Sequence, residues 1–327
     1  MLWGENMEIK QIENDQDRKK YDEIVKESGS IFNSTRWLKL FEDRIKFFGI
    51  YENEKIKGGF ALYCEKKFGL KICLNPPFTP YVGPVFKVES QNHVNIMSKW
   101  KEVSSLMAET VENLSFSIIA FSLSYNVIDV QPFIWKKFKI IPEFTYILDL
   151  SQAVDDIYRN MSPERRNDIT RAIKDGVITR KVDDYDLVKS LVLKTFERQG
   201  KRINLTWLEK ILFDFVTPEN CFAFVSFKGA KAISAMLCIH NNSYAHYLLG
   251  GYDESSKHRG AGALSIWEGI IYAKDLGLKC FDFEGSMVPE IEKYFRGFGG
   301  VLTPYFRVNK AKLPLEIFLK FYKRELF

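Results

Sequence analysis

The stretch GGYDESSKHRGAGALSIWEGIIYAKDLG, residues 250–277, joins the end of a strand to a helix through a basic turn with two glycines. Apolar residues from 263 to 273 recur at helical spacing, and Gly277 is a typical helix stop. The turn itself, residues 257–262, has two interpretations. Its glycines and cations could admit an anion to the helix N-terminus, or it is a flexible surface entry into a helix.

The segments around this helix place the turn in a defined context. SYAHYLLGG (243–251) and KCFDFEG (279–285) each have the composition of a strand. A strand, a crossover helix and a second strand predict parallel pairing of the two strands. The turn then lies at the carboxyl end of the first strand, where parallel α/β units bind ligands. This position favours the anion-binding interpretation.

The same order of elements occurs twice along the chain. A predicted hairpin, a third strand, a loop and a helix follow one another from residue 47 to 112 and again from 221 to 277. The repeat predicts an α/β protein with two tandem units, each a mixed, mostly antiparallel sheet flanked by helices. We expect the boundary near Asp149–Gln152, which gives domains 1–150 and 151–327. A helix beginning at Ser162-Pro163 and ending near Gly176 opens the second domain.

The composition of the chain indicates which classes of protein it can belong to. The 327 residues are 46% hydrophobic and 27% charged, as in a folded two-domain protein, and the net charge of +5 gives no clear nucleic-acid footprint. No segment reads as a signal peptide or a membrane span, so we expect a cytoplasmic protein that binds no DNA. The five cysteines lack a C-x-x-C motif and predict neither disulfides nor a metal site. They are Cys64, Cys73, Cys221, Cys238 and Cys280.

Several motifs together carry a family resemblance. IFNSTRWLKLF, NPPFTPYVGP, YRNMSPERRNDITRAIKDG, FDFEGS and KYFRGFGG, with the Lys-x-x-Gly-x-Gly turn, cover most of the chain. This set resembles the GNAT acyltransferases, specifically the duplicated branch that includes Fem-type proteins and sugar-nucleotide N-acyltransferases. Lys257 departs from the Gln or Arg usual at the first position of the family's turn. The resemblance implies two GNAT-like units and direct transfer of an acyl group from coenzyme A to an amine.

The resemblance also implies a binding site for coenzyme A, with no metal. Backbone amides at the helix start would hold the pyrophosphate, and the cations of the turn would neutralise it. Amides near Leu248–Gly250, including that of Leu249, would face the developing oxyanion. The residues of the turn implied in binding are Lys257, Arg259, Gly260, Ala261, Gly262 and Ala263.

Four residues are candidates for proton transfer. His246 lies in an apolar strand, as either a base or a core histidine bonded to a carbonyl. Asp282 and Glu284 share one strand face, as a base, a binding group for the amine, or part of an ion pair. Glu284 is favoured because it lies nearer the carboxyl end. Tyr294 is either the acid for the thiolate or a buried tyrosine packed on Phe298.

The first copy differs from the second where the turn should be. It has YVGPVF, and Pro84 cannot donate a hydrogen bond to phosphate, so this copy predicts a degenerate wall of the acceptor pocket. Tyr81 and Tyr247 are candidate contacts for the acceptor. The Pro-rich NPPFTPYVGP is equally well explained as a stiff connection.

Three functions fit the sequence. The first is an N-acyltransferase that moves an acyl group from acyl-coenzyme A to a nucleotide-linked amino sugar, for bacterial surface polysaccharides such as O-antigen lipopolysaccharide. The second is a Fem-type aminoacyltransferase that takes its group from aminoacyl-tRNA to build peptidoglycan cross-bridges. The third is a non-catalytic binding protein on the same fold. The intact turn favours the first.

Overall fold

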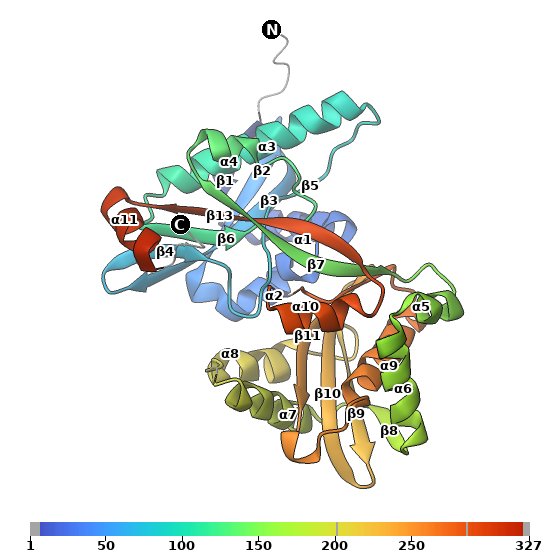
Figure 1. Ribbon diagram of the computed structural model, residues 1–327. Helices are drawn as coiled ribbons and strands as arrows, with labels where there is room; N and C mark the ends of the chain where they lie inside the picture. Colours follow the sequence, from blue (N-terminus) through green and yellow to red (C-terminus); the bar gives the residue numbers. More distant parts are fainter. Residues whose placement is uncertain (1–6, 201, 286, 323–327) are drawn as a thin grey trace. The chain divides into compact units, whose positions relative to one another are not determined.

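The computed structural model describes residues 7–200, 202–285 and 287–322, which form two compact units (Figure 1). Unit 1 comprises residues 1–143 and 304–327, and unit 2 comprises residues 144–303. The chain passes between the units within β7 (Lys139–Asp149) and β13 (Val301–Ala311). Within the described ranges, no helix has the length and apolar content needed to cross a membrane.

Unit 1 contains a mixed sheet with the strand order β1-β2-β3-β4-β6-β13. Strands β4 and β6 are parallel, and the other neighbours are antiparallel. The strands that precede β7 are β1 (Met7–Gln11), β2 (Ile45–Glu52), β3 (Lys55–Lys67), β4 (Leu70–Leu74), β5 (Val85–Phe86) and β6 (Ile118–Ser122). The helices of this unit are α1 (Asp15–Ser28), α2 (Thr35–Leu38), α3 (His93–Asn113), α4 (Gln131–Trp135) and α11 (Leu313–Tyr322).

Unit 2 repeats this topology in the order β8-β9-β10-β11-β12-β7. Strands β11 and β12 are parallel, as predicted, and the others are antiparallel. The prediction of two mixed sheets flanked by helices is thus confirmed. The strands before α9 are β8 (Val177–Val182), β9 (Cys221–Lys228), β10 (Lys231–His240) and β11 (Tyr244–Tyr252), and β12 (Cys280–Asp282) follows that helix. The helices are α5 (Val154–Asn160), α6 (Pro163–Lys174), α7 (Tyr185–Arg198), α8 (Leu205–Glu209), α9 (Ala261–Asp275) and α10 (Pro289–Arg296).

Local sequence signals explain the ends of the helices in unit 2. Helix α6 begins after Ser162, whose hydroxyl accepts a hydrogen bond from the Arg165 amide at 3.2 Å, and Pro163 occupies its first position. Gly176 and Gly277, which follow α6 and α9, have φ angles of +74° and +78°. Both glycines end their helices in the left-handed conformation that glycine adopts without strain, as the sequence predicts.

The sheet of unit 2 separates two layers of helices. One face is apolar and packs in a single cluster with α9, and it includes Phe222, Met236 and Phe281. The other face lies against α7, where a Cβ atom added to Gly251 would lie 2.4 Å from the Leu191 backbone. This close approach explains why a glycine is needed in the strand.

A β-bulge at Leu248 changes the predicted side-chain alternation of β11. Leu237 pairs with Leu249, whereas the next residue, Cys238, pairs with Tyr247, so Leu248 is the extra residue. A Cβ atom on Gly250 would lie 1.8 Å from the Tyr247 hydroxyl oxygen, so Gly250 shares the face of Tyr247. Strict alternation predicts that Tyr247 and Leu249 share a face. That expectation is wrong, because the bulge reverses the faces after Tyr247.

Candidate active site

Strands β11 and β12 pair over only three residues. The last pair is His246 with Asp282, and β11 continues to Tyr252 while β12 ends at Asp282. The edge of β11 beyond His246 therefore has no ladder to β12 in the described part of unit 2. The amides near Leu249 that the family resemblance implicates belong to this stretch of β11. Because β12 does not pair with it, the stretch is a suitable place for a ligand to bind between the two strands.

Three ionisable side chains meet where the pairing ends. His246 Nδ1 lies 3.5 Å from an Asp282 carboxyl oxygen and 3.9 Å from Oε1 of Glu284. The side chains of His246 and Asp282 are fully buried, and that of Glu284 is 13% exposed. The structure thus brings together three of the four residues that the sequence indicates for proton transfer. A buried cluster of this kind is typical of functional sites.

Asp282 is held in place by two hydrogen bonds to its Oδ1 atom. The Thr145 hydroxyl donates one at 2.5 Å, and the Glu284 amide donates the other at 2.8 Å. The second oxygen, Oδ2, is the one that faces His246. Asp282 is therefore oriented from two sides, which fixes the direction in which its carboxyl group meets the imidazole.

The turn after β12 directs Glu284 back toward His246. Glu284 has a φ angle of +55°, a left-handed conformation that costs energy for a residue with a side chain. Gly285 follows with φ +64°, and a Cβ atom there would lie 2.0 Å from the Phe144 carbonyl oxygen. Only glycine fits at 285. The strained backbone at Glu284 places its carboxyl group in the buried cluster.

The environment of Glu284 disfavours the charged form of its carboxyl group. Burial, and secondarily the neighbouring Asp282 charge, raise the pKa of Glu284 well above its usual value of 4.5. Among the described residues, Oε1 of Glu284 has no hydrogen-bond partner. A buried oxygen without a partner is costly, so an atom in this position is suited to receive a hydrogen bond from a ligand or a water molecule.

The glycine-containing turn leads directly into α9. Gly260 is the N-cap residue, and no side chain caps the first turn of the helix. The Gly260 amide donates to Nδ1 of His258 at 3.2 Å. The first turn of α9 contains no acidic residue, so its amides and the helix dipole favour an anion there.

The cations of this turn already have acidic partners. Arg259 Nε lies 2.9 Å from Asp168, His258 Nε2 lies 3.0 Å from Asp175, and Lys257 lies 3.3 Å from Glu254. Asp168 is on α6 and Asp175 directly follows it. The Arg259 and Lys257 side chains remain 61% and 58% exposed. They can therefore exchange these partners for a phosphate at modest cost.

The two glycines of the turn differ in the contacts that a side chain would make at each position. A Cβ atom on Gly260 would lie 1.9 Å from the Asp168 carbonyl oxygen, so Gly260 is required for α6 to pack on the turn. A Cβ atom on Gly262 would lie 3.2 Å from the Tyr294 hydroxyl oxygen and 3.6 Å from that of Ser234. Gly262 thus leaves a small space lined by two hydroxyl groups.

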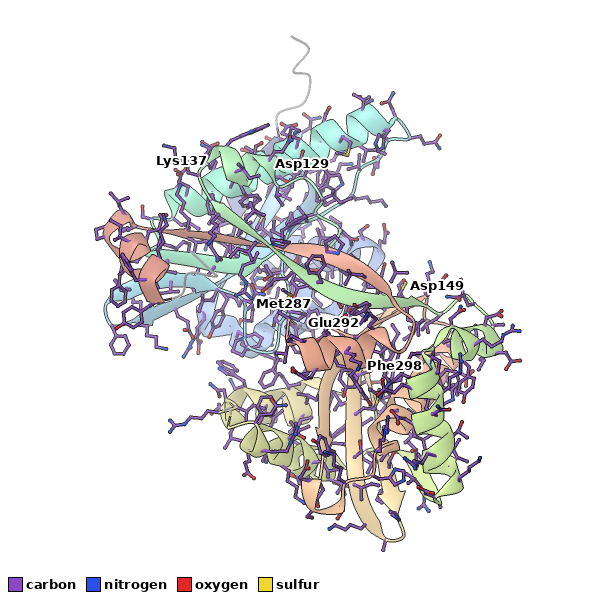
Figure 2. All side chains as sticks on the ribbon, viewed as in Figure 1. Asp129, Lys137, Asp149, Met287, Glu292 and Phe298 are labelled. Atoms are coloured by element: carbon purple, nitrogen blue, oxygen red, sulfur yellow. The ribbon has the colours of Figure 1, made fainter. Side chains whose placement is uncertain are left out.

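Tyr294 lies beside the start of α9. Its ring packs on Phe298 at 5.5 Å, and the Arg165 guanidinium covers it at 4.3 Å from the ring centre. Burial raises the pKa of Tyr294 above its usual value of 10. Figure 2 labels Glu292 and Phe298, which belong to α10 and to the turn after it, and Glu292 accepts a hydrogen bond from the Tyr146 hydroxyl.

The tyrosines proposed as acceptor contacts both pack against other aromatic rings. Tyr247 packs against Phe295 with ring centres 5.4 Å apart, and burial raises the pKa of its hydroxyl. Tyr81 belongs to unit 1 and is 1% exposed, with its ring in edge contact with three other aromatic rings. Those rings belong to Phe32, Tyr125 and Tyr305.

Sequence reasoning missed two residues of this region. Thr145 lies on β7, far from Asp282 in the chain, and no local signal connects the two. Arg165 reads as one of several surface cations in SPERRNDITR, yet its side chain is 7% exposed and pairs with Asp168 at 2.9 Å. The signal that could have found Arg165 is its i, i+3 spacing to Asp168 at the start of α6.

Comparisons with known proteins concern the fold of the chain and the family that part of it matches. The family model described as an acetyltransferase (GNAT) domain matches residues 164–296. A search of curated protein sequences found no match. Among solved structures, the chain is similar to FemX, with 13% identity and a TM-score of 0.69 over 95% of this chain and 100% of that one.

Two further structures share the fold. One is the C-terminal DUF2156 domain assigned to a lysylphosphatidylglycerol synthetase from Agrobacterium fabrum, with 12% identity and a TM-score of 0.58 over 94% of this chain and 96% of that one. The other is L-PGS from Bacillus licheniformis, with 13% identity and a TM-score of 0.55 over 97% of this chain and 99% of that one. Residues 164–296 thus match the model of an acetyltransferase (GNAT) domain, and the fold of the chain is similar to that of FemX.

Proposed function

We propose that the protein is an N-acyltransferase that uses acyl-coenzyme A as donor and the amino group of a nucleotide-linked amino sugar as acceptor. The observation that carries the proposal is the buried His246, Asp282 and Glu284 cluster where β11 and β12 stop pairing. The GNAT match over residues 164–296 supports transferase chemistry in this unit.

The proton balance of amide formation assigns roles to the cluster. When bound, the thioester supplies an activated carbonyl carbon, to which the amine nitrogen bonds as the carbon–sulfur bond breaks. The nitrogen must lose one proton and the departing thiolate must gain one. His246 takes the proton of the amine, and the Asp282 oxygen 3.5 Å from Nδ1 stabilises the imidazolium. Oε1 of Glu284, which has no hydrogen-bond partner among the described residues, accepts a hydrogen bond that orients the acceptor.

The start of α9 fits the diphosphate of coenzyme A. Its first turn has no side-chain cap, and Lys257 and Arg259 are exposed cations beside it. The small space that Gly262 leaves beside the Tyr294 and Ser234 hydroxyl groups keeps a side chain away from the start of the helix. Tyr294, whose hydroxyl borders that space and stays protonated near neutral pH, is positioned to supply the proton for the thiolate.

One observation favours a second donor. Arg259 and His258 are each paired with an acidic residue at or near α6, which reduces the charge offered to a diphosphate. The fold likeness to FemX keeps aminoacyl-tRNA as the alternative donor of a Fem-type reaction. In that case the cluster at His246 performs the same proton transfer, and the start of α9 binds no coenzyme A.

Calorimetric titration with acetyl-coenzyme A and with bacterial aminoacyl-tRNA separates the two donors. We expect saturable binding of acetyl-coenzyme A that is lost in Gly262→Val, because the added side chain fills the space beside Tyr294. The matched control is Val94→Ala, since Val94 holds the same second position in α3 of unit 1 and is 70% exposed. This control should bind like the parent protein.

The outcomes of this titration decide between the donors. Binding of aminoacyl-tRNA alone, with a steep salt dependence, would replace coenzyme A by the Fem-type donor. Binding of neither would leave a non-catalytic protein. If acetyl-coenzyme A binds, a screen of amino-sugar nucleotides for thiol release tests the acceptor, and turnover only with other amines would reject the sugar.

A further inference from the structure

The end of unit 1 formed by α11 and the β3–β4 turn carries unusually exposed apolar side chains. None of the residues of α11 is buried, and Phe68 in the turn is 94% exposed. The exposed residues of α11 are Leu313 (73%), Ile317 (54%), Phe318 (54%), Phe321 (84%) and Tyr322 (76%). Such a concentration of apolar surface marks an interaction site.

The helix and the turn lie at the same end of one sheet. The Ser117 amide donates to the Lys71 carbonyl at 2.7 Å, and the Lys312 amide donates to the Ser117 carbonyl at 3.0 Å. Lys71 is the second residue of β4, and Lys312 directly precedes α11. Ser117 therefore connects the two segments through backbone hydrogen bonds, and Figure 1 shows α11 beside β4.

Lysines surround these apolar side chains. Lys66 and Lys67 precede Phe68, and Lys312 precedes Leu313; all three lysines are exposed. Within the described ranges, no ion pair involves any of the three. An open groove of about 660 Å³ beside the turn is lined by Arg44 and four lysines, Lys46, Lys66, Lys67 and Lys71, against two acidic residues, Asp43 and Glu65. The apolar side chains are thus bordered by an excess of positive charge.

We propose that this end of unit 1, composed of α11 and residues 66–71, is a docking surface for an anionic membrane. Leu313, Ile317 and Phe321 recur every four residues and form one row on α11, with Phe318 and Tyr322 stacked beside them at 4.6 Å between ring centres. A short helix with exposed aromatic residues and adjacent lysines lies in the headgroup region, and α11 has only ten residues. The lysines match the negative charge of phosphatidylglycerol.

Co-sedimentation of the full chain with lipid vesicles tests this proposal independently of the transferase function. We expect binding to vesicles of phosphatidylcholine with added phosphatidylglycerol, and weak binding to phosphatidylcholine alone. Phe318→Ser with Phe321→Ser should weaken binding by about tenfold or more, from the lost apolar burial. Lys66→Glu with Lys67→Glu should weaken it by at least about fivefold per lysine.

Matched controls use exposed residues of unit 1 away from this end. Val94→Ser with Ile128→Ser replaces apolar residues that are 70% and 76% exposed, and Lys19→Glu with Lys39→Glu makes the same change in net charge. Circular dichroism checks that every variant is folded. Equal binding to both vesicle types, or unchanged binding of the α11 variant, would overturn the proposal. So would self-association in sedimentation velocity that the α11 substitutions abolish, because the surface would then be an interface between two copies.

Discussion

The parallel strand pairs of the two units have the same register but different side chains. In unit 2 the three pairs end with His246 opposite Asp282, and in unit 1 they end with Leu74 opposite Ala120. The residue two positions beyond the second strand partner is Glu284 in unit 2 and Ser122 in unit 1. The same backbone arrangement thus carries an ionisable cluster in unit 2 and, at the matched positions of unit 1, the uncharged side chains of Leu74, Ala120 and Ser122.

The space after each strand pair is also used differently. In unit 1 the chain itself fills it, because Val82 forms a parallel bridge to Leu123 and its amide donates to the Ser122 carbonyl at 2.9 Å. Asn75 secures this segment by donating to the carbonyls of Thr79 and Pro80 and accepting from the Ser122 amide. The Pro-rich connection is therefore an internal strut of unit 1.

This difference shows how a duplicated fold can lose a site without losing stability. In unit 1, the backbone groups at the splayed strand ends are satisfied by residues 75–82 of the same chain. In unit 2, the strand edge beyond His246 has no such partner in the described residues, which leaves it to a ligand. The comparison predicts that substitutions at matched positions affect activity in unit 2 and stability in unit 1.

The largest expected effect is the loss of activity in His246→Gln. Glutamine keeps the side-chain volume but cannot accept a proton, so kcat/KM should fall by about 10² to 10⁴. Steady-state assay of thiol release measures this. Leu74→Ala at the matched position of unit 1 should lower stability and leave the kcat of the folded protein unchanged. Equal losses in both variants would contradict the assignment of chemistry to unit 2.

Gly260→Ala should destabilise unit 2 strongly. The added Cβ atom would meet the Asp168 carbonyl oxygen at 1.9 Å, so α6 must move, at a cost of about 3 kcal/mol. Urea denaturation measures the change. Gly262→Ala, with its nearest contact at 3.2 Å, should change stability by less than about 1 kcal/mol. Similar stabilities of the two variants would show that α6 does not pack on Gly260.

Asn75→Ala tests the strut of unit 1. The substitution removes three hydrogen bonds to the segment that fills the strand ends, and the free energy of unfolding should fall by about 2 kcal/mol. Thermal denaturation and proteolysis near residues 76–84 report the change. Donor binding in unit 2 should be unaltered, and a loss of donor binding at full stability would contradict the division of roles.

Glu284→Gln should change how stability depends on pH. Because the folded pKa of Glu284 is raised above 4.5, the folded protein holds a proton that the unfolded chain releases above about that pH. The native protein therefore loses stability as pH rises, by up to about 1.4 kcal/mol per pH unit. Glutamine removes this loss. In urea denaturation from about pH 5 to 8, the free energy of unfolding of the variant should rise relative to that of the parent protein as the pH increases. Parallel pH profiles of this free energy would contradict a raised pKa of Glu284.

Much of unit 2 follows from local sequence patterns. The capping signals at Ser162, Gly176 and Gly277 determine where α6 and α9 begin and end, and the strand–helix–strand order predicts the parallel pairing that joins His246 to Asp282. The bulge at Leu248 is not encoded in the alternation of β11 alone, because a bulge depends on the partner strand. The role of Gly260 depends in the same way on α6, which packs on it from a distant part of the chain.

The chain leaves unit 1 within β7 and returns to it within β13, and this order has a consequence for synthesis on the ribosome. Unit 2 is a single continuous stretch, 144–303, whereas the sheet of unit 1 is completed only by β13, whose residues 307–311 pair with β6. Because synthesis proceeds from the N-terminus, unit 1 begins to emerge first but cannot complete its sheet until all of unit 2 has been synthesised. We therefore expect β6 to remain an open edge during translation, exposed to chaperones or to misplaced strands until the final segment arrives.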